Sequence, residues 1–97
     1  MIEIKLFPAI GSFAENKDVA RDIRVNTIIP ALDRGVQATI DFKNVDSTTQ
    51  SFIHALISDL IRKYGGEVLD KIYFKNCNET IQKIITIVVD YMQESES

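Results

Sequence analysis

Apolar and polar residues alternate at the start of the chain, over Ile2–Phe7. Ile2, Ile4 and Leu6 fall on one side of this segment, and charged residues stand between them. This period of two predicts a β-strand with one buried face. Pro8 cannot donate to a sheet ladder, so we expect the strand to end there in a turn region.

Residues 16–33 follow a helical period, with one side formed by Val19, Ala20, Ile23, Ile28 and Leu32. Asn16 is the expected N-cap, because its short side chain can accept hydrogen bonds from the first free N–H groups. Pro30 conflicts with a continuous helix, since proline removes a hydrogen bond and clashes with the carbonyl four residues earlier. We therefore expect a kink, or a separate turn that begins near Ile29, with Gly35 as the stop.

A second strand is predicted over Val36–Phe42, and it is the expected central strand because further strand and helix units follow it. The next helix is the clearest element, since its apolar residues form one stripe. The stripe consists of Phe52, Ile53, Leu56, Ile57, Leu60, Ile61 and Tyr64. Ser47, with Gln50 three residues later, matches a capping box, and Thr48 or Thr49 is the alternative N-cap.

A third strand is predicted over Asp70–Lys75, after a helix stop at Gly65–Gly66. The last helix begins after Asn78, its expected N-cap. Its inward stripe consists of Ile81, Ile84, Ile85, Val88 and Met92. Gln93–Ser97 is expected to form a short polar tail.

Strands and helices therefore alternate along the chain. This order favours a mostly parallel sheet with right-handed crossovers. We predict a small α/β sandwich in a single domain, residues 1–92, with a three- to four-stranded sheet and helices mainly on one face. A chain of 97 residues is long enough for one hydrophobic core.

Composition and charge narrow the class of protein. Hydrophobic residues make up 45% and charged residues 26% of the chain, as in ordinary globular domains. A net charge of −3 argues against sequence-independent binding of nucleic acid. No apolar run reaches the roughly 18 residues that a membrane span needs, and the alternating start does not match a signal peptide. We therefore expect a cytoplasmic protein that binds neither nucleic acid nor membranes.

Candidate chemical groups are few. Four residues with hydroxyl side chains lie close together at the start of the second helix: Ser47, Thr48, Thr49 and Ser51. They are either candidate phosphoacceptors or hydroxyls that cap the helix. No metal-ligand spacing is visible, so we expect no metal and no cofactor. The only histidine, His54, and the only thiol, Cys77, are not brought together by any spacing, so we expect no catalysis.

The segment Ala38–Val45 contains a hydrophobic strand that ends in Asp, then a turn and a valine, and a helix follows. In this pattern the chain resembles STAS domains, the fold of bacterial anti-sigma-factor antagonists. It resembles more closely the divergent STAS-like family of unknown function, in which an Asp-Phe-x-x-Val stretch leads to a Ser-Phe pair. The corresponding residues here are Asp41, Phe42, Val45, Ser51 and Phe52.

This resemblance implies a non-enzymatic regulatory domain that binds a protein partner, often a GHKL-type kinase that is also an anti-sigma factor. It further implies that phosphorylation of a Ser or Thr at the start of the second helix releases the partner. A phosphoryl group adds about −1.5 to −2 charges. Because the helix dipole and the free N–H groups favour an anion there, binding can be lost without unfolding.

The chain departs from the family pattern at the phosphoacceptor. Counted from Asp41 and Val45, the family's Asp-Ser pair falls on Thr49–Gln50, and a glutamine cannot accept a phosphoryl group. Ser51 comes one residue later, and Phe52 stands where a glycine usually follows. We predict a partner surface that runs from the turn after Val45 into the exposed face of the second helix. It consists of Asp46, Ser47, Thr48, Thr49 and Ser51, with Ala55 and Ser58 as its candidate extension.

Two other hypotheses remain open. The first is a small-ligand or nucleotide site at the carboxyl edge of the sheet, where open α/β sheets place their ligands. Its lining would consist of Asp41, Asp46, Asn76 and Asn78. The second is a homodimer through the last helix, whose Ile87, Val89 and Tyr91 lie off the inward stripe.

Overall fold

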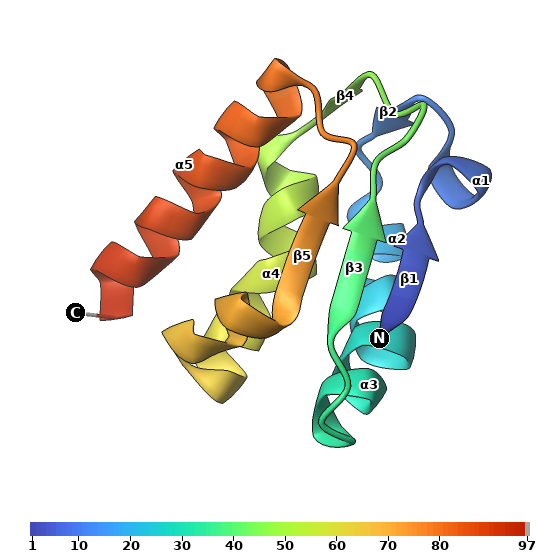
Figure 1. Cartoon of the computed structure of the whole chain (residues 1–97). Coiled ribbons are helices and arrows are strands. Elements are labelled where there is room, and N and C mark those ends of the chain that lie inside the picture. The colour runs from blue at the N-terminus through green and yellow to red at the C-terminus, as the bar shows by residue number, and fades with distance from the viewer. Residues whose placement is uncertain (97) are drawn as a thin grey trace.

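The computed structural model describes residues 1–96, and side chains as far as Glu94 (Figure 1). Its elements are β1 (Ile2–Lys5), α1 (Phe7–Ile10), β2 (Phe13–Ala14), α2 (Lys17–Ile23), η1 (Arg24–Ile28), α3 (Ile29–Asp33), β3 (Ala38–Asp41), β4 (Ser47–Thr48), α4 (Gln50–Tyr64), η2 (Gly66–Lys71), β5 (Ile72–Lys75) and α5 (Glu79–Glu96). Here η1 is a π-helical turn and η2 is a 3-10 helix. The predicted α/β fold is confirmed.

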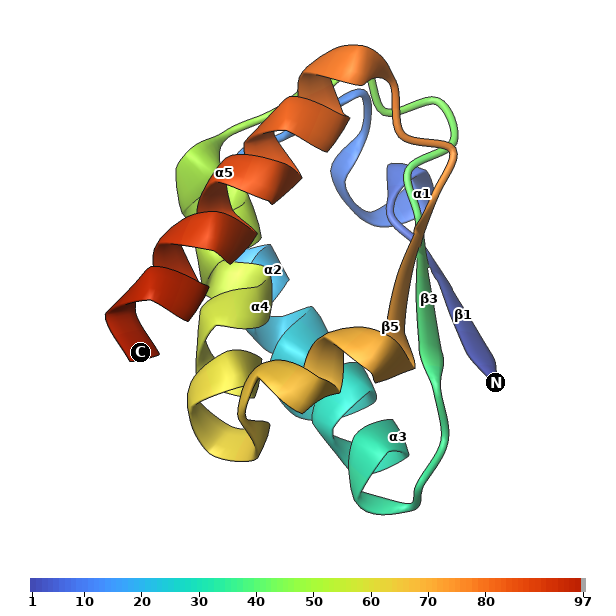
Figure 2. The same cartoon turned by 60° about the vertical axis from the view of Figure 1, so that its left-hand side comes forward.

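One sheet contains three parallel strands in the order β1-β3-β5. The central strand is β3, as the sequence predicts. Helices α2, α3, α4 and α5 lie on one side of this sheet (Figure 2). The prediction of a mostly parallel sheet with helices mainly on one face is therefore confirmed, and the sheet has three strands.

The two faces of the sheet carry different residues. Ile40 pairs with Ile4 on one side and with Phe74 on the other, and this row faces the helices. Asp41, in the next row, pairs with Lys5 and Lys75 and faces the open side, because side chains alternate along a strand. The open face of the sheet is therefore polar.

The core lies between the sheet and the helices, and α4 runs through its middle. Six apolar side chains of α4 are buried, all of them in the predicted stripe: Phe52, Ile53, Leu56, Ile57, Leu60 and Ile61. Burial of each such side chain stabilises the fold by about 1.5–3 kcal/mol. The tyrosine that ends the predicted stripe, Tyr64, is only half-buried.

The helical segment before Pro30 is interrupted as predicted. An α-helix, α2, ends at Ile23, a π-helical turn follows, and α3 begins at Ile29. Proline lies in the first turn of α3, where its missing N–H matters least. The wider π turn makes room for the ring that an unbroken helix would exclude.

Helix termini follow the predicted capping chemistry. The Asn16 side chain accepts from the backbone N–H groups of Asp18 and Val19, at 2.9 and 3.4 Å. Among the candidate caps of α4, Thr49 is the one that caps, since its hydroxyl accepts from Phe52 N at 3.0 Å. The Ser47 capping box is therefore wrong.

The end of α4 and the start of α5 also agree with the sequence. Gly65 ends α4 with a positive φ of 83°, a conformation that glycine adopts without strain. Asn78 accepts from Ile81 N at 2.9 Å, as an N-cap does. Helix α5 continues through Glu96, so most of the predicted tail is helical, and Ser97 lies outside the described residues.

A second sheet is absent from the sequence prediction. It joins β2 and β4 in parallel and pairs Phe13 with Ser47 and Ala14 with Thr48. Strands of two residues are too short to show an alternating pattern, so only the fold reveals them. The predicted turn after Pro8 likewise contains the single helical turn α1. None of the described helices is both long and apolar enough to cross a membrane.

Candidate functional site

The four hydroxyl residues at the start of α4 have different surroundings. Thr48 is buried, and its hydroxyl donates to the carbonyl of Ala14 at 2.8 Å. The Thr49 hydroxyl is the helix cap, and Ser47 is half-buried in β4. Ser51 is the only one of the four that is exposed. Of the four hydroxyl residues, Ser51 is therefore exposed, Thr48 and Thr49 use their hydroxyls within the fold, and Ser47 is half-buried.

Ser51 lines an open depression of about 470 Å³ between α4 and α5. The lining is mixed, with polar groups from α2 and α4 and apolar groups mainly from α5: Lys17, Gln50, Ser51, His54, Ala55, Ile87, Val88 and Tyr91. Half of Ile87 and 62% of Tyr91 remain exposed. The sequence places residues of α4 here but not those of α5, because nothing in the sequence shows that the two helices meet at this end.

The remaining residues of the predicted partner surface differ in their exposure to solvent. Asp46 is exposed, and its carbonyl accepts from Asn78 Nδ2 at 2.7 Å. Ala55 is half-buried and lines the depression around Ser51. Ser58 is 3% exposed, so its placement on the exposed face of α4 is wrong. It lies two residues from Leu56 and Leu60 in a segment of α4 that is buried on more than one side.

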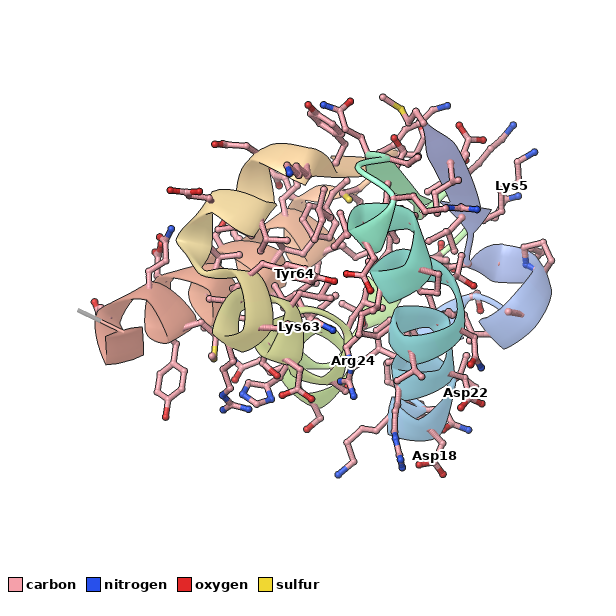
Figure 3. The ribbon with its side chains drawn as sticks, turned by 90° about the horizontal axis from the view of Figure 1, so that it is seen from below. Lys5, Asp18, Asp22, Arg24, Lys63 and Tyr64 are labelled. Atoms are coloured by element: carbon pink, nitrogen blue, oxygen red, sulfur yellow. The ribbon has the colours of Figure 1, made fainter. Side chains whose placement is uncertain are left out.

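Arg24 fixes α4 to the preceding helical segment, a role that the sequence does not indicate. Figure 3 shows Arg24 between this segment and α4. From the first residue of η1, Arg24 donates to the carbonyl of Ala55, and its Nη2 lies 3.2 Å from Asp59 Oδ2. The arginine side chain is 12% exposed, whereas that of Asp59 is 48% exposed. Arg24 thereby holds the helix that carries Ser51 and Ala55.

The carboxyl edge of the sheet brings Asp41 and Asn76 together, as the ligand hypothesis expects. Asp41 Oδ1 accepts from Asn76 Nδ2 at 2.8 Å and from Lys43 N at 2.9 Å. These two hydrogen bonds, with smaller contributions from Lys75 and Lys5, lower the pKa of Asp41 despite its burial. Asp41 is therefore a carboxylate at neutral pH.

A second open depression, of about 830 Å³, lies at this edge. Asn78 lines it together with Asp41 and Asn76, whereas Asp46 does not. Three lysines that are not among the sequence-predicted site residues also line it: Lys5, Lys43 and Lys75. The strand register is the signal that could have found two of them, because it places Lys5 and Lys75 beside Asp41.

The two remaining reactive side chains lie apart. His54 is half-buried and lines the depression around Ser51. Cys77 is half-buried at the carboxyl edge, where desolvation and then the charge of Asp41 raise the pKa of the thiol to about 11. A protonated thiol is a poor nucleophile. Among the described residues, no three His, Cys, Asp or Glu side chains are grouped to hold a metal ion.

The face of α5 that motivates the homodimer hypothesis is only partly exposed. Ile87 and Tyr91 are exposed, but Val89 is half-buried and packs against the core. Two exposed apolar residues are common on monomeric proteins. Self-association through α5 stays a prediction.

The parallel three-stranded sheet, the helices on one of its faces and the exposed start of α4 define a small STAS-like α/β domain. The family model of the STAS-like domain of unknown function matches residues 19–82, and the chain belongs to this family. The match covers roughly two thirds of the chain and includes Asp41–Val45 and the Ser51–Phe52 pair. No curated protein and no solved structure matches the chain.

Proposed function

We propose that the chain is a non-catalytic regulatory domain that binds a partner protein through the start of α4 and the adjoining face of α5. The observation that carries this proposal is the position of Ser51, which is exposed, is the second residue of α4 and lines the α4–α5 depression. Membership of the STAS-like family supports a regulatory role. The partner class that the family resemblance implies is a GHKL-type ATPase that is also a protein kinase.

The chemistry of the depression suits a protein surface. Ile87 and Tyr91 offer apolar area that a partner can cover. Lys17, Gln50 and His54 supply polar groups from α2 and α4 in the same lining. Protein interfaces combine apolar contact area with polar groups in this way.

Phosphorylation of Ser51 is the proposed control. A phosphoryl group there would stand at the N-terminus of a 15-residue helix, where the dipole favours negative charge. The domain would therefore stay folded while a charged, hydrated group entered the partner surface. Thr48 and Thr49 suit this role less, because one is buried against Ala14 and the other caps α4.

A charge substitution at Ser51 tests the proposal, with Thr80 as the matched control. Thr80 is exposed and is the second residue of α5, so Thr80→Asp adds the same charge at the same helical position away from the depression. Purified GHKL-type ATPases of the source organism are titrated against the wild-type chain, Ser51→Asp and Thr80→Asp. Ser51→Asp is expected to weaken binding of one of them by at least about tenfold, and Thr80→Asp to leave it unchanged.

The same partner should then act on the chain. Incubation with ATP is expected to place one phosphoryl group on Ser51, located by mass spectrometry of peptides. If Ser51→Asp binds as tightly as the wild type, or if the phosphoryl group appears on another residue, the proposed control by phosphorylation of Ser51 is wrong. If no GHKL-type ATPase binds the wild-type chain, the proposed partner class is wrong.

A further inference from the structure

The depression at the carboxyl edge of the sheet gathers positive charge from three separate segments. Lys5 ends β1, Lys43 follows β3, and Lys75 ends β5. Figure 3 shows Lys5 at the outer side of β1, next to the short helix α1 and away from α4 and α5. The two carboxylates in the same lining are Glu3 and Asp41. The depression is thus locally positive in a chain whose net charge is −3.

The carboxylates do not neutralise the three lysines equally. Lys75 Nζ lies 3.2 Å from Glu3 Oε2, so this lysine already has a counter-ion. Within the described residues, neither Lys5 nor Lys43 forms an ion pair. The Asp41 oxygen Oδ1 is already engaged by Asn76 and by the backbone N–H of Lys43. The ammonium groups of Lys5 and Lys43, which both line the depression, therefore remain available to an anion.

Asn44 adds a neutral donor beside them. Asn44 lines the same depression and lies in the turn after β3, where its backbone adopts a positive φ of 69°. Its side-chain amide forms no hydrogen bond with any residue that the structure describes. Ammonium and amide donors around an open space are the groups that bind phosphate oxygens.

We propose that this depression binds a small phosphate-bearing ligand through the ammonium groups of Lys5 and Lys43 and the side-chain amide of Asn44. A phosphate group carries close to two charges at neutral pH, so it gains from two ammonium groups at once. Asp41 lies beside the site and limits affinity, because a carboxylate repels the ligand. This inference shares no residue with the depression around Ser51 and does not rest on the proposed function.

Amide chemical shifts of the whole chain, measured by NMR during titration, test the proposal. The probes are inorganic phosphate, adenosine 5′-monophosphate and malonate, each compared with sodium chloride at the same ionic strength, because salt screens exposed charges. Inorganic phosphate and the nucleotide are expected to shift the amides of Lys5, Lys43–Asn44 and Asn76–Asn78. Equal affinity for these two probes would assign recognition to the phosphate group alone. Tighter binding of the nucleotide would assign the phosphate to a nucleotide ligand.

Three charge-matched variants show which lysines hold the ligand. Lys5→Gln and Lys43→Gln are each expected to weaken phosphate binding by about two- to fivefold, the effect of one solvent-exposed charge pair. Lys83→Gln removes the same charge from an exposed position on α5, outside the depression, and is expected to have no effect. All three side chains are exposed, so the fold should persist, as the unperturbed amides will report.

Several results would overturn the inference. Chloride and phosphate could give the same shifts, or the shifts could scatter over the whole surface. Lys83→Gln could weaken binding as much as Lys43→Gln, which would mean that only the overall charge matters. Malonate could bind as tightly as phosphate, which would remove the assignment to phosphate groups.

Discussion

Asn76 donates its side-chain amide to Oδ1 of Asp41 at 2.8 Å and so joins the end of β5 to the end of β3. The same oxygen accepts from the backbone N–H of Lys43, so one buried carboxylate organises the turns after two strands. Asp41 and Asn76 lie 35 positions apart in the sequence. The carboxyl edge of the sheet is therefore held by a side-chain contact in addition to the sheet ladder.

Replacement of Asn76 measures this contact. Asn76→Ala removes a hydrogen bond to a charged group, which stabilises a fold by about 1.5–3 kcal/mol. It also places alanine at a positive φ of 59°. Asn44→Ala is the matched control, because Asn44 has a φ of 69° and makes no side-chain hydrogen bond within the described part of the chain. Chemical denaturation should show the larger loss for Asn76→Ala, and equal losses would mean that only backbone strain matters.

Acid should destabilise the domain partly through Asp41. Its pKa is lowered in the folded state, so on acidification the unfolded chain binds the proton first. The stability that Asp41 contributes is present above its usual pKa of 3.8 and is lost as the pH falls toward the folded value. Asp41→Asn keeps the accepting oxygen but not the charge. The free energy of unfolding of this variant should therefore fall less steeply than that of the wild type as the pH drops below 3.8.

Arg24 should matter more than Arg62, although both pair with Asp59. Arg24 is largely buried and also donates to the carbonyl of Ala55, whereas Arg62 is 59% exposed. Arg24→Met is expected to cost about 1–3 kcal/mol of stability. Arg62→Met is expected to cost less than about 1 kcal/mol, as exposed ion pairs do. Thermal or urea unfolding of both variants measures these two losses of stability. A similar loss of stability in the two variants would contradict the role of Arg24 in fixing α4.

Tyr64 joins the end of α4 to α3, since its hydroxyl donates to Asp33 Oδ1 at 2.6 Å. Figure 3 shows the ring of Tyr64 directed from α4 toward that segment. Burial first, and then the bond to Asp33, raise the pKa of Tyr64 to about 12. Because the folded pKa lies above the unfolded one, stability should fall as the pH rises from about 10 to 12. Tyr64→Phe should remove the tyrosine step near pH 12 from an ultraviolet titration and flatten this alkaline loss of stability.

Cys77 should react slowly with thiol reagents. Its pKa is raised from 9.0 to about 11, so the folded chain holds about a hundredfold less thiolate than an exposed cysteine at pH 8. Ellman's reagent should therefore react much faster in denaturant than in buffer. Fast reaction of the folded chain would mean that the start of α5 lowers the thiol pKa, contrary to the surroundings described above.

Local chemistry in the sequence was sufficient for the order of the three main strands and the longer helices, but not for the short elements α1, β2 and β4. Alternation in β1, the stripe of α4, the caps Asn16 and Asn78 and the break near Pro30 all depend on residues a few positions apart. Such patterns persist whatever the rest of the chain does. The family resemblance through Asp41–Val45 is of the same kind.

Only the tertiary structure decided which functional groups meet. It buried Thr48 against Ala14, exposed Ser51 beside α5, and placed Lys5 and Lys75 on either side of Asp41. Each of these relationships joins residues that are distant in the sequence, and a periodic pattern holds no information about distant partners. The exposure of the Ser51 hydroxyl and the positive charges beside the Asp41 carboxylate both result from the packing of the sheet and helices. Neither could therefore be predicted from the sequence alone.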